Sequence, residues 1–173
     1  MVRPAASGPF PLRESDGVRI RHLREGEEPV VLEALNRAWA LTWNFRPIPL
    51  AALLADLKGQ RKGFFVAVAR TEDTHILGTV HALFDHEACN PDGQPYAWIS
   101  NLTVDPALQG QGLGRMLLAF GLNYLNQQGA GSVTLGVDGG AIAPMTLYRS
   151  TGFEVLSTVE IWEQSRARLH EEK

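Results

Sequence analysis

Gly110, Gly112 and Gly114 stand one residue apart, between the strand-like run 96–104 and the helix-like apolar run that follows. Glycine destabilises a helix by about 0.5–1 kcal/mol relative to alanine, so three glycines at a helix entrance need a reason. Two reasons are available: a phosphate group that contacts bare backbone, or a tight turn without any ligand. In either case the stretch requires a fold in which a strand leads through a glycine-rich turn into a long helix.

The residues around these glycines exclude two well-known phosphate loops. A Walker loop has Lys and then Ser or Thr after its last glycine, whereas Arg115 and Met116 follow Gly114. The dinucleotide fingerprint needs a glycine where Arg115 stands, within a first βαβ unit. What remains is the pattern Gln-x-x-Gly-x-Gly, formed by Gln109, Gly112 and Gly114. The unpaired N–H groups and the positive dipole end of the following helix make such a turn suitable for an anion.

Length, charge and cysteine content limit the class of protein. The 173 residues suffice for one domain with a hydrophobic core, and they contain no apolar run long enough to predict a membrane helix. The formal net charge of −3, with Lys and Arg scattered along the chain, argues against nucleic-acid binding. The single Cys89 excludes an internal disulfide and favours a reducing, cytoplasmic compartment.

Hydrophobic periodicity predicts one mixed domain over residues 18–164, preceded by a flexible arm (1–17) and followed by a charged tail (165–173). The fold class is α/β of the α+β type: a mixed, mostly antiparallel sheet of six to seven strands flanked by about four helices. Strands are expected at 18–23, 63–70, 75–84, 96–104, 132–137 and 152–162, and a turn-rich loop at 85–95. Helices are expected at 27–41, 50–58, 112–129 and 143–150.

Two stretches resemble the GNAT superfamily of N-acetyltransferases. LTVDPALQGQGLGRMLL (102–118) is similar to the pyrophosphate motif that binds acetyl-CoA in this family, and APMTLYRSTGF (143–153) to its tyrosine helix and following strand. The resemblance implies the GNAT fold, in which two splayed strands hold the pantetheine arm of acetyl-CoA. Residues 36–48 and 112–129 further resemble mycothiol-synthase-like sequences, which have two GNAT repeats where this chain has one.

The resemblance assigns a set of residues to acetyl-CoA. Leu102 and Val104 would offer backbone groups to the pantetheine arm, and the Val104 N–H would bond the thioester carbonyl. Arg115 would either approach a phosphate or remain a solvated residue of the first helical turn. No metal is implied, because the histidines lack ligand spacing. The backbone N–H groups expected to hold the pyrophosphate are those of Gln109, Gly110, Gln111, Gly112, Leu113 and Gly114.

The resemblance also places the chemistry. Tyr148 takes the position of the general acid that protonates the departing CoA thiolate, although it could instead be a packed aromatic residue. Two positions depart from the family pattern: Ala141 stands where many relatives have Asn, and Trp98 where many have a glutamate base. The general base therefore stands at another position, is replaced by a chain of water molecules, or is not needed because the acceptor amine arrives neutral. Candidate bases are His81, Asp85, His86 and Glu87, each of which could also be a structural or solvated residue.

The segment 42–49 lies where relatives build the wall of the acceptor site. Trp43 and Phe45 would supply apolar contacts, or simply fill the core, and Arg46 would meet an acceptor carboxylate or phosphate. Asp85 is a further candidate contact. The expected activity is direct transfer of an acetyl group from acetyl-CoA to a primary amine of a small molecule or peptide. The alternative is a non-catalytic acyl-CoA-binding module, and a homodimer is compatible with either.

Overall fold

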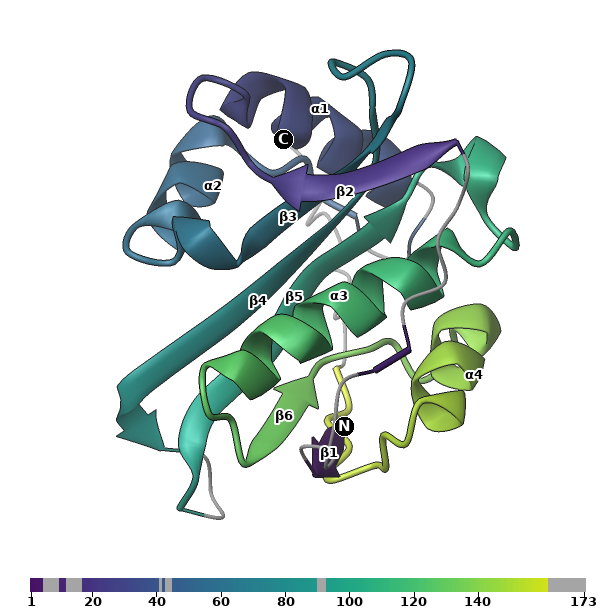
Figure 1. Cartoon of the computed structure of the whole chain (residues 1–173). Coiled ribbons are helices and arrows are strands. Elements are labelled where there is room, and N and C mark those ends of the chain that lie inside the picture. The colour runs from purple at the N-terminus through teal and green to yellow at the C-terminus, as the bar shows by residue number, and fades with distance from the viewer. Residues whose placement is uncertain (5–9, 12–16, 41, 43–44, 90–92, 162–173) are drawn as a thin grey trace, which may run out of the picture.

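The computed structural model describes residues 1–4, 10–11, 17–40, 42, 45–89 and 93–161. Its centre is a six-stranded sheet in the order β1-β6-β5-β4-β3-β2 (Figure 1). β5 and β6 run parallel, and all other neighbouring strands are antiparallel. This is the mixed, mostly antiparallel sheet that the sequence predicts. The strands are β1 (Val2–Pro4), β2 (Val18–His22), β3 (Phe64–Ala69), β4 (Ile76–Cys89), β5 (Pro95–Val104) and β6 (Ser132–Leu135).

Helices cover both faces of the sheet, and α3 crosses in front of β4 and β5 in Figure 1. Strand β3 shows why two helical layers are needed: its residues Phe64 to Val68 are all buried, and successive side chains enter opposite cores. Phe65 packs with Leu118 on the α3 side, while Phe64 packs with Leu35 on the α1–α2 side. The helices are α1 (Glu28–Trp39), α2 (Leu50–Leu57), α3 (Leu113–Gln127) and α4 (Ile142–Ser150).

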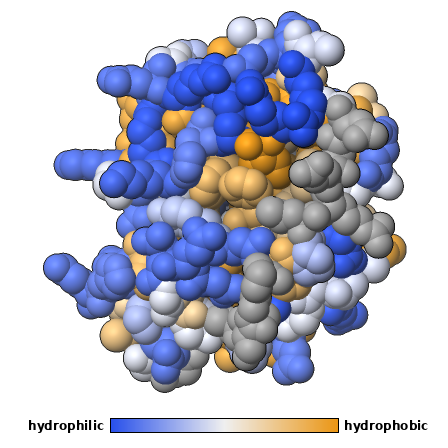
Figure 2. Space-filling model, in the orientation of Figure 1, coloured by the Kyte–Doolittle hydropathy of each residue, from blue (hydrophilic) through white to orange (hydrophobic). Residues whose placement is uncertain are grey.

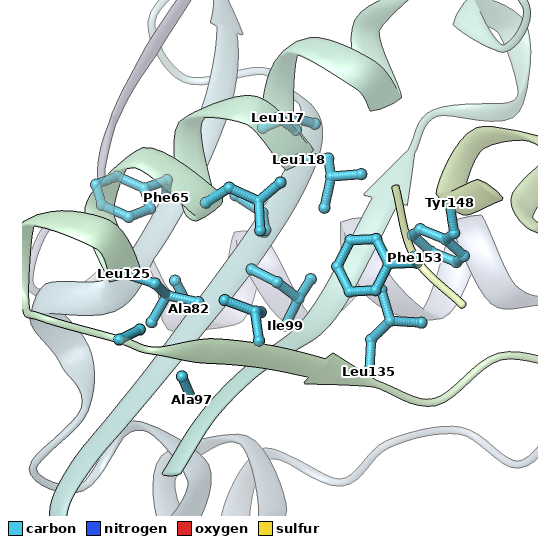
Figure 3. Packing of buried hydrophobic residues seen from close by; sticks show 14 of the residues in the cluster. Phe65, Ala82, Ala97, Ile99, Leu117, Leu118, Leu125, Leu135, Tyr148 and Phe153 are labelled. Carbon is cyan, nitrogen blue, oxygen red and sulfur yellow. The ribbon is translucent and has the colours of Figure 1, made fainter. Parts of the chain in front are cut away.

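The core on the α3 side is built from one helix face and the sheet beneath it. Leu117, Leu118 and Leu125 of α3 lie over Ala82 and Ile99 of the two central strands (Figure 3). Leu118 and Leu125 lie seven residues, or two helical turns, apart and so share one face of the helix. The sequence predicts a face formed by Leu113, Met116, Leu117, Phe120 and Tyr124, of which Leu113 and Leu117 are buried and the other three are partly buried. The burial of this face fixes the N-terminus of α3 against the ends of the central strands.

The two ends of the described chain depart from the sequence prediction. Val2–Pro4, expected to belong to a flexible arm, forms β1 and pairs with β6. Val2 also exchanges backbone hydrogen bonds of 2.9 and 2.8 Å with Glu154. β1 therefore lies between β6 and Glu154, and the strand expected at 152–162 is wrong: its described part contributes a single bridge to the sheet. Val155, Leu156, Val159 and Ile161 are exposed there.

The loop predicted at 85–95 is also wrong in its first half, because β4 continues to Cys89. Asp85 pairs with Tyr96 and Cys89 with Pro95, so β4 and β5 form one long hairpin. The polar residues after Phe84 predict an exposed segment, and the segment is exposed, but its pairing with β5 makes it a strand and not a loop. None of the described helices is long and apolar enough to cross a membrane.

One hydrophobic area is visible on the surface that Figure 2 shows, between β2 and α3. Val18 and Ile20 of β2 and Phe120 of α3 are partly buried and pack against the core on the α3 side of the sheet. The alternate residues of β2, Arg19 and Arg21, form ion pairs with Asp73. Such charges on an edge strand disfavour pairing with another chain.

Candidate active site

The two parallel strands of the sheet separate in the middle of the molecule. In the described part of the chain, β5 and β6 share two register pairs, Trp98 with Thr134 and Ile99 with Leu135. β5 continues for five more residues to Val104, whereas β6 ends at Leu135. The backbone of β5 beyond Ile99 is therefore paired with β4 on one side and diverges from β6 on the other.

A β-bulge occurs where the strands separate. Thr79 of β4 pairs with Thr103 and His81 pairs with Ser100, so two β5 residues, Asn101 and Leu102, face one residue of β4. Asn101 has φ +47°, a left-handed conformation that asparagine tolerates better than most residues. The Thr79 hydroxyl donates to the Asn101 carbonyl at 2.6 Å, which holds the bulge in place. The bulge increases the local twist and directs the end of β5 away from β6.

The backbone groups of Val104 face the gap between the strands. The Asp105 N–H donates to the Leu77 carbonyl at 2.8 Å. Near the end of β5, the odd-numbered residues are therefore the ones whose backbone groups hydrogen-bond to β4. Val104, opposite Gly78, is then a non-bonded position whose N–H and C=O point away from β4. Gln109 Nε2 lies 3.4 Å from the Val104 carbonyl oxygen and donates to it. Leu102 lies within the bulge and is half-buried.

The glycine-rich turn joins the end of β5 to α3. Gly110 has φ +77° and Gly112, the N-cap of α3, has φ +87°, conformations that side chains other than glycine rarely adopt. A Cβ on either residue would have no atom within 4 Å, so the space beside both is open. Gly114 differs: its Cβ would make ordinary contacts with Val104 and Leu147. The turn therefore needs glycine at two positions for backbone conformation, and it leaves open space at the helix N-terminus.

The remaining residues expected at this turn fall into two groups. Gln109 and Gln111 are exposed, whereas Leu113 is buried and anchors the first helical turn in the core. Arg115 is exposed and donates to the Ser150 hydroxyl at the end of α4. Arg115 thus connects α3 with α4 at the edge of the turn.

Tyr148 is a buried residue of α4. It is 7% exposed, and its ring packs edge-on against Phe153 with centroids 5.8 Å apart. Both rings lie near Leu135, at the point where β6 leaves β5 (Figure 3). Burial raises the pKa of the Tyr148 phenol to about 12. The phenol is therefore protonated, and able to donate a proton, at every physiological pH.

His81 lies on the opposite face of the sheet, against Phe64, with ring centroids 4.9 Å apart. It is 1% exposed, and its Nε2 lies 3.2 Å from the carbonyl oxygen of Gln60. A carbonyl only accepts, so Nε2 carries the proton, and in the neutral ring Nδ1 is the free lone pair. Nδ1 is buried without a hydrogen-bond partner. Burial lowers the pKa of His81, so the neutral form is favoured.

The other candidate bases lie further along β4. Asp85 accepts from the backbone N–H of Glu87 at 2.8 Å, while His86 is exposed and packs edge-on against Phe84. Asp85 lies opposite Tyr96, whereas His81 lies opposite Ser100, the residue before the bulge. Of these four, His81 is therefore the one closest in register to the point where the strands separate.

The segment expected to form the acceptor wall is fixed to α1 by Asn36. The Asn36 side chain accepts from the Ile48 N–H at 2.7 Å and donates to the Ile48 carbonyl at 3.2 Å. Phe45 is half-buried, and exposed Arg46 donates to the Phe45 carbonyl at 3.0 Å. Trp43 lies outside the described residues. Sequence reasoning missed Asn36, because its partner Ile48 lies 12 residues away and no local pattern joins the two.

A family comparison agrees with this combination of split strands, bulge and glycine turn. The model of the acetyltransferase (GNAT) family matches residues 29–153. The chain belongs to this family. The match includes the glycine turn and ends at Phe153, so it covers both stretches on which the sequence resemblance rests.

Relatives similar to this chain are mycothiol acetyltransferases. That of Kocuria rhizophila is 36% identical over 161 residues, covering 88% of this chain and 51% of the relative. That of Thermobifida fusca is 35% identical over 163 residues, covering 88% of this chain and 49% of the relative. The chain therefore spans about half the length of the curated relatives it matches.

Solved structures confirm the fold. An aminoglycoside N-acetyltransferase, AAC(6′)-Iy in complex with CoA, superimposes with a TM-score of 0.66 at 18% identity. The match covers 88% of this chain and 98% of that structure. The GNAT fold implied by the sequence resemblance is therefore confirmed.

Proposed function

We propose that this chain transfers an acetyl group from acetyl-CoA to a primary amine by direct attack of the amine on the thioester. The observation that carries the proposal is the separation of β5 from β6 beyond Ile99 and Leu135, at the strand end that leads into the glycine turn. Family membership supports acetyl transfer as the reaction. The names of the relatives, mycothiol and aminoglycoside acetyltransferases, favour a small-molecule amine as the acceptor.

Acetyl-CoA would lie between the separated strands. The open space beside Gly110 and Gly112 leaves the N–H groups at the start of α3 free to approach a pyrophosphate. The Val104 N–H, which points away from β4, would donate to the thioester carbonyl and stabilise the negative charge that develops on its oxygen. The backbone of Leu102 would contact the pantetheine arm, and Arg115, held by Ser150, would border the phosphates.

Tyr148 would act as the general acid. A phenol with a pKa raised to about 12 stays protonated until it donates, which suits protonation of a departing thiolate. Its ring is held in place by packing beside Leu135 and Phe153. The hydroxyl would therefore complete the transfer without forming a covalent bond to the acetyl group.

His81 would be the base. Its Nδ1 lone pair is free because the Gln60 carbonyl holds the proton on Nε2, and its lowered pKa keeps the ring neutral. Neutral imidazole can accept the proton that the attacking amine loses. Asp85, Phe45 and Arg46 would contact the acceptor, with Trp43 as a fourth expected contact. Homodimer formation and a cytoplasmic location stay predictions from the sequence.

Release of the CoA thiol with a panel of primary amines tests the proposal. The rival function, a module that binds acyl-CoA without turnover, is favoured by Trp98 and Ala141 at the two positions that depart from the family pattern. Calorimetric titration with CoA would measure binding, and a thiol reagent would measure turnover. Binding without turnover on a broad amine panel would establish the rival, and absence of CoA binding would contradict both.

A further inference from the structure

Trp98 covers the point at which the two parallel strands separate. It is paired with Thr134, one residue before the last pair between β5 and β6. Its Cζ2 atom lies 3.5 Å from the position of a Cβ on Gly136, the residue that follows β6. The indole therefore extends from β5 across to the start of the diverging β6 end, in contact with backbone that carries no side chain.

Tyr96 continues this surface along β5. The rings of Tyr96 and Trp98 are stacked with centroids 6.2 Å apart and an angle of 7° between their planes. Residues two apart on a strand share a face, which brings the two rings together. Both side chains are half-buried, so part of this parallel pair is exposed. We call Tyr96 and Trp98 the aromatic platform.

The platform lies on the face of the sheet opposite α3. Ala97 and Ile99, the alternate residues of β5, belong to the core beneath α3. His81 lies opposite Ser100 in the antiparallel register, and directly opposed residues share a face. The platform is thus on the same face as the proposed base, next to the bulge that ends the regular pairing.

We propose that the aromatic platform binds the ring that carries the acceptor amine. Two stacked rings cover each other's inner faces, and an outer face of the stack is a flat apolar surface that complements the C–H face of a sugar ring or the face of an aromatic ring. A ring stacked there would place its amine beside Ser100, the register partner of buried His81, where the strands diverge. The inference rests on the proposed function, and it makes Trp98 a specificity residue at a position where a carboxylate would otherwise act as base.

Calorimetric titration of the CoA-bound protein tests the inference without requiring turnover. The probes are glucosamine for a sugar ring, phenethylamine for an aromatic ring, and n-butylamine as an acyclic amine. We expect at least one ring amine to bind about 5- to 10-fold more tightly than n-butylamine, as aromatic stacking predicts. The ring amine that shows the preference identifies which kind of ring the platform takes.

Three variants assign the preference to the platform. Trp98→Leu should remove most of it, and Trp98→Phe, which keeps a ring, should retain part of it. The matched control is Phe84→Leu, which removes a half-buried aromatic residue of β4 on the α3 face and should leave the preference intact. In turnover assays Trp98→Leu should raise KM for the ring amine by the same factor and leave KM for acetyl-CoA unchanged.

The outcomes separate the inference from the proposed function. Wild-type protein that shows no ring preference, or a folded Trp98→Leu variant that keeps it, would overturn the inference. Thiol release with n-butylamine in that case would leave the proposed function standing. Binding of CoA without thiol release from any amine would instead overturn the proposed function, whatever the platform binds.

Discussion

Ile99 of β5 and Leu135 of β6 are the last paired residues of two parallel strands, which separate beyond them. The bulge at Asn101, two residues after Ile99, bends β5 while its pairing with β4 continues to Val104. A site that needs a gap in a sheet is thus built by one extra residue in one strand. The residues around this gap, from the glycine turn to Tyr148, are the ones that the following predictions address.

Substitution of Gly112 tests the anion site. Gly112→Val should weaken CoA binding about 10- to 150-fold, since hydrogen bonds to a charged group contribute about 1.5–3 kcal/mol and the new side chain enters the space beside the turn. Gly26→Val is the matched control, because Gly26 has φ +86° and equally open surroundings but lies in the turn before α1. Calorimetry with CoA compares the two. Equal affinity in both folded variants would contradict the assignment.

Removal of the Tyr148 hydroxyl tests the general acid. Tyr148→Phe should lower kcat about 100-fold, the lower end for general acid–base catalysis, with little change in the Kd for acetyl-CoA. Because burial raises the pKa of Tyr148 to about 12, the wild-type kcat should show no loss from deprotonation of this phenol up to about pH 11. Tyr124→Phe, on the partly buried Tyr124 of α3, is the control. An unchanged kcat, with chemistry rate-limiting, would leave Tyr148 a packing residue.

The N-cap of α4 offers a gain of stability. Ala141 has φ −82° and ψ 95°, an extended conformation suited to capping, but its side chain cannot accept a hydrogen bond. Ala141→Asn should add about 1 kcal/mol, which corresponds to a rise in Tm of about 2–4 °C. Differential scanning calorimetry would measure it, with Ala143→Asn, one position inside the helix start, as a control that adds the amide without the cap.

The same position distinguishes capping from cofactor contact. Ala141→Asp should stabilise α4 as Ala141→Asn does, because both side chains can accept from the backbone N–H of Ala143, whereas Pro144 has none. Only the neutral amide should also tighten CoA binding, since a carboxylate repels phosphate. If neither variant changes CoA affinity, residue 141 does not contact the cofactor in this chain.

Buried His81 predicts a loss of stability on mild acidification. Burial lowers the pKa of His81 in the folded state, whereas the unfolded chain takes up a proton near pH 6.5. The contribution of neutral His81 to the free energy of unfolding is therefore complete above about pH 6.5, and it falls as the pH drops towards the pKa of His81 in the folded state. Urea unfolding at pH 7.5 and 5.5 should show a smaller difference for His81→Gln than for the wild type, with exposed His75→Gln as control.

The paired carboxylates change the free energy of unfolding in a lower pH range than His81 does. Arginine partners lower the pKa of Asp73 and Glu27, so their contributions are lost only below the ordinary carboxylate range near pH 4. The interval from pH 7.5 to 5.5 consequently reports on His81 rather than on these ion pairs. An unchanged pH dependence in the His81→Gln variant would show that His81 is protonated equally in both states.

Local sequence was sufficient for the elements whose structure depends on near neighbours. The glycine turn, α3 with its apolar stripe and Gly129 with φ +91° after its end were all predictable from residue spacing. The same holds for α4 around Tyr148 and for the neighbouring strands β3 and β4, which a short polar segment joins. In each case backbone conformation or helical periodicity is set by residues within a few positions of one another.

The tertiary structure alone decided which strands become neighbours and what each side chain faces. The sequence 152–162 has a strand-like pattern, yet β1 takes the place beside β6, because pairing is a competition between distant segments. Likewise, pairing with β5 keeps the polar end of β4 in a strand conformation as far as Cys89. The stacking of Tyr96 on Trp98 and the free Nδ1 of His81 follow from that register and from burial. Such contacts arise only when chain segments far apart in sequence are packed together.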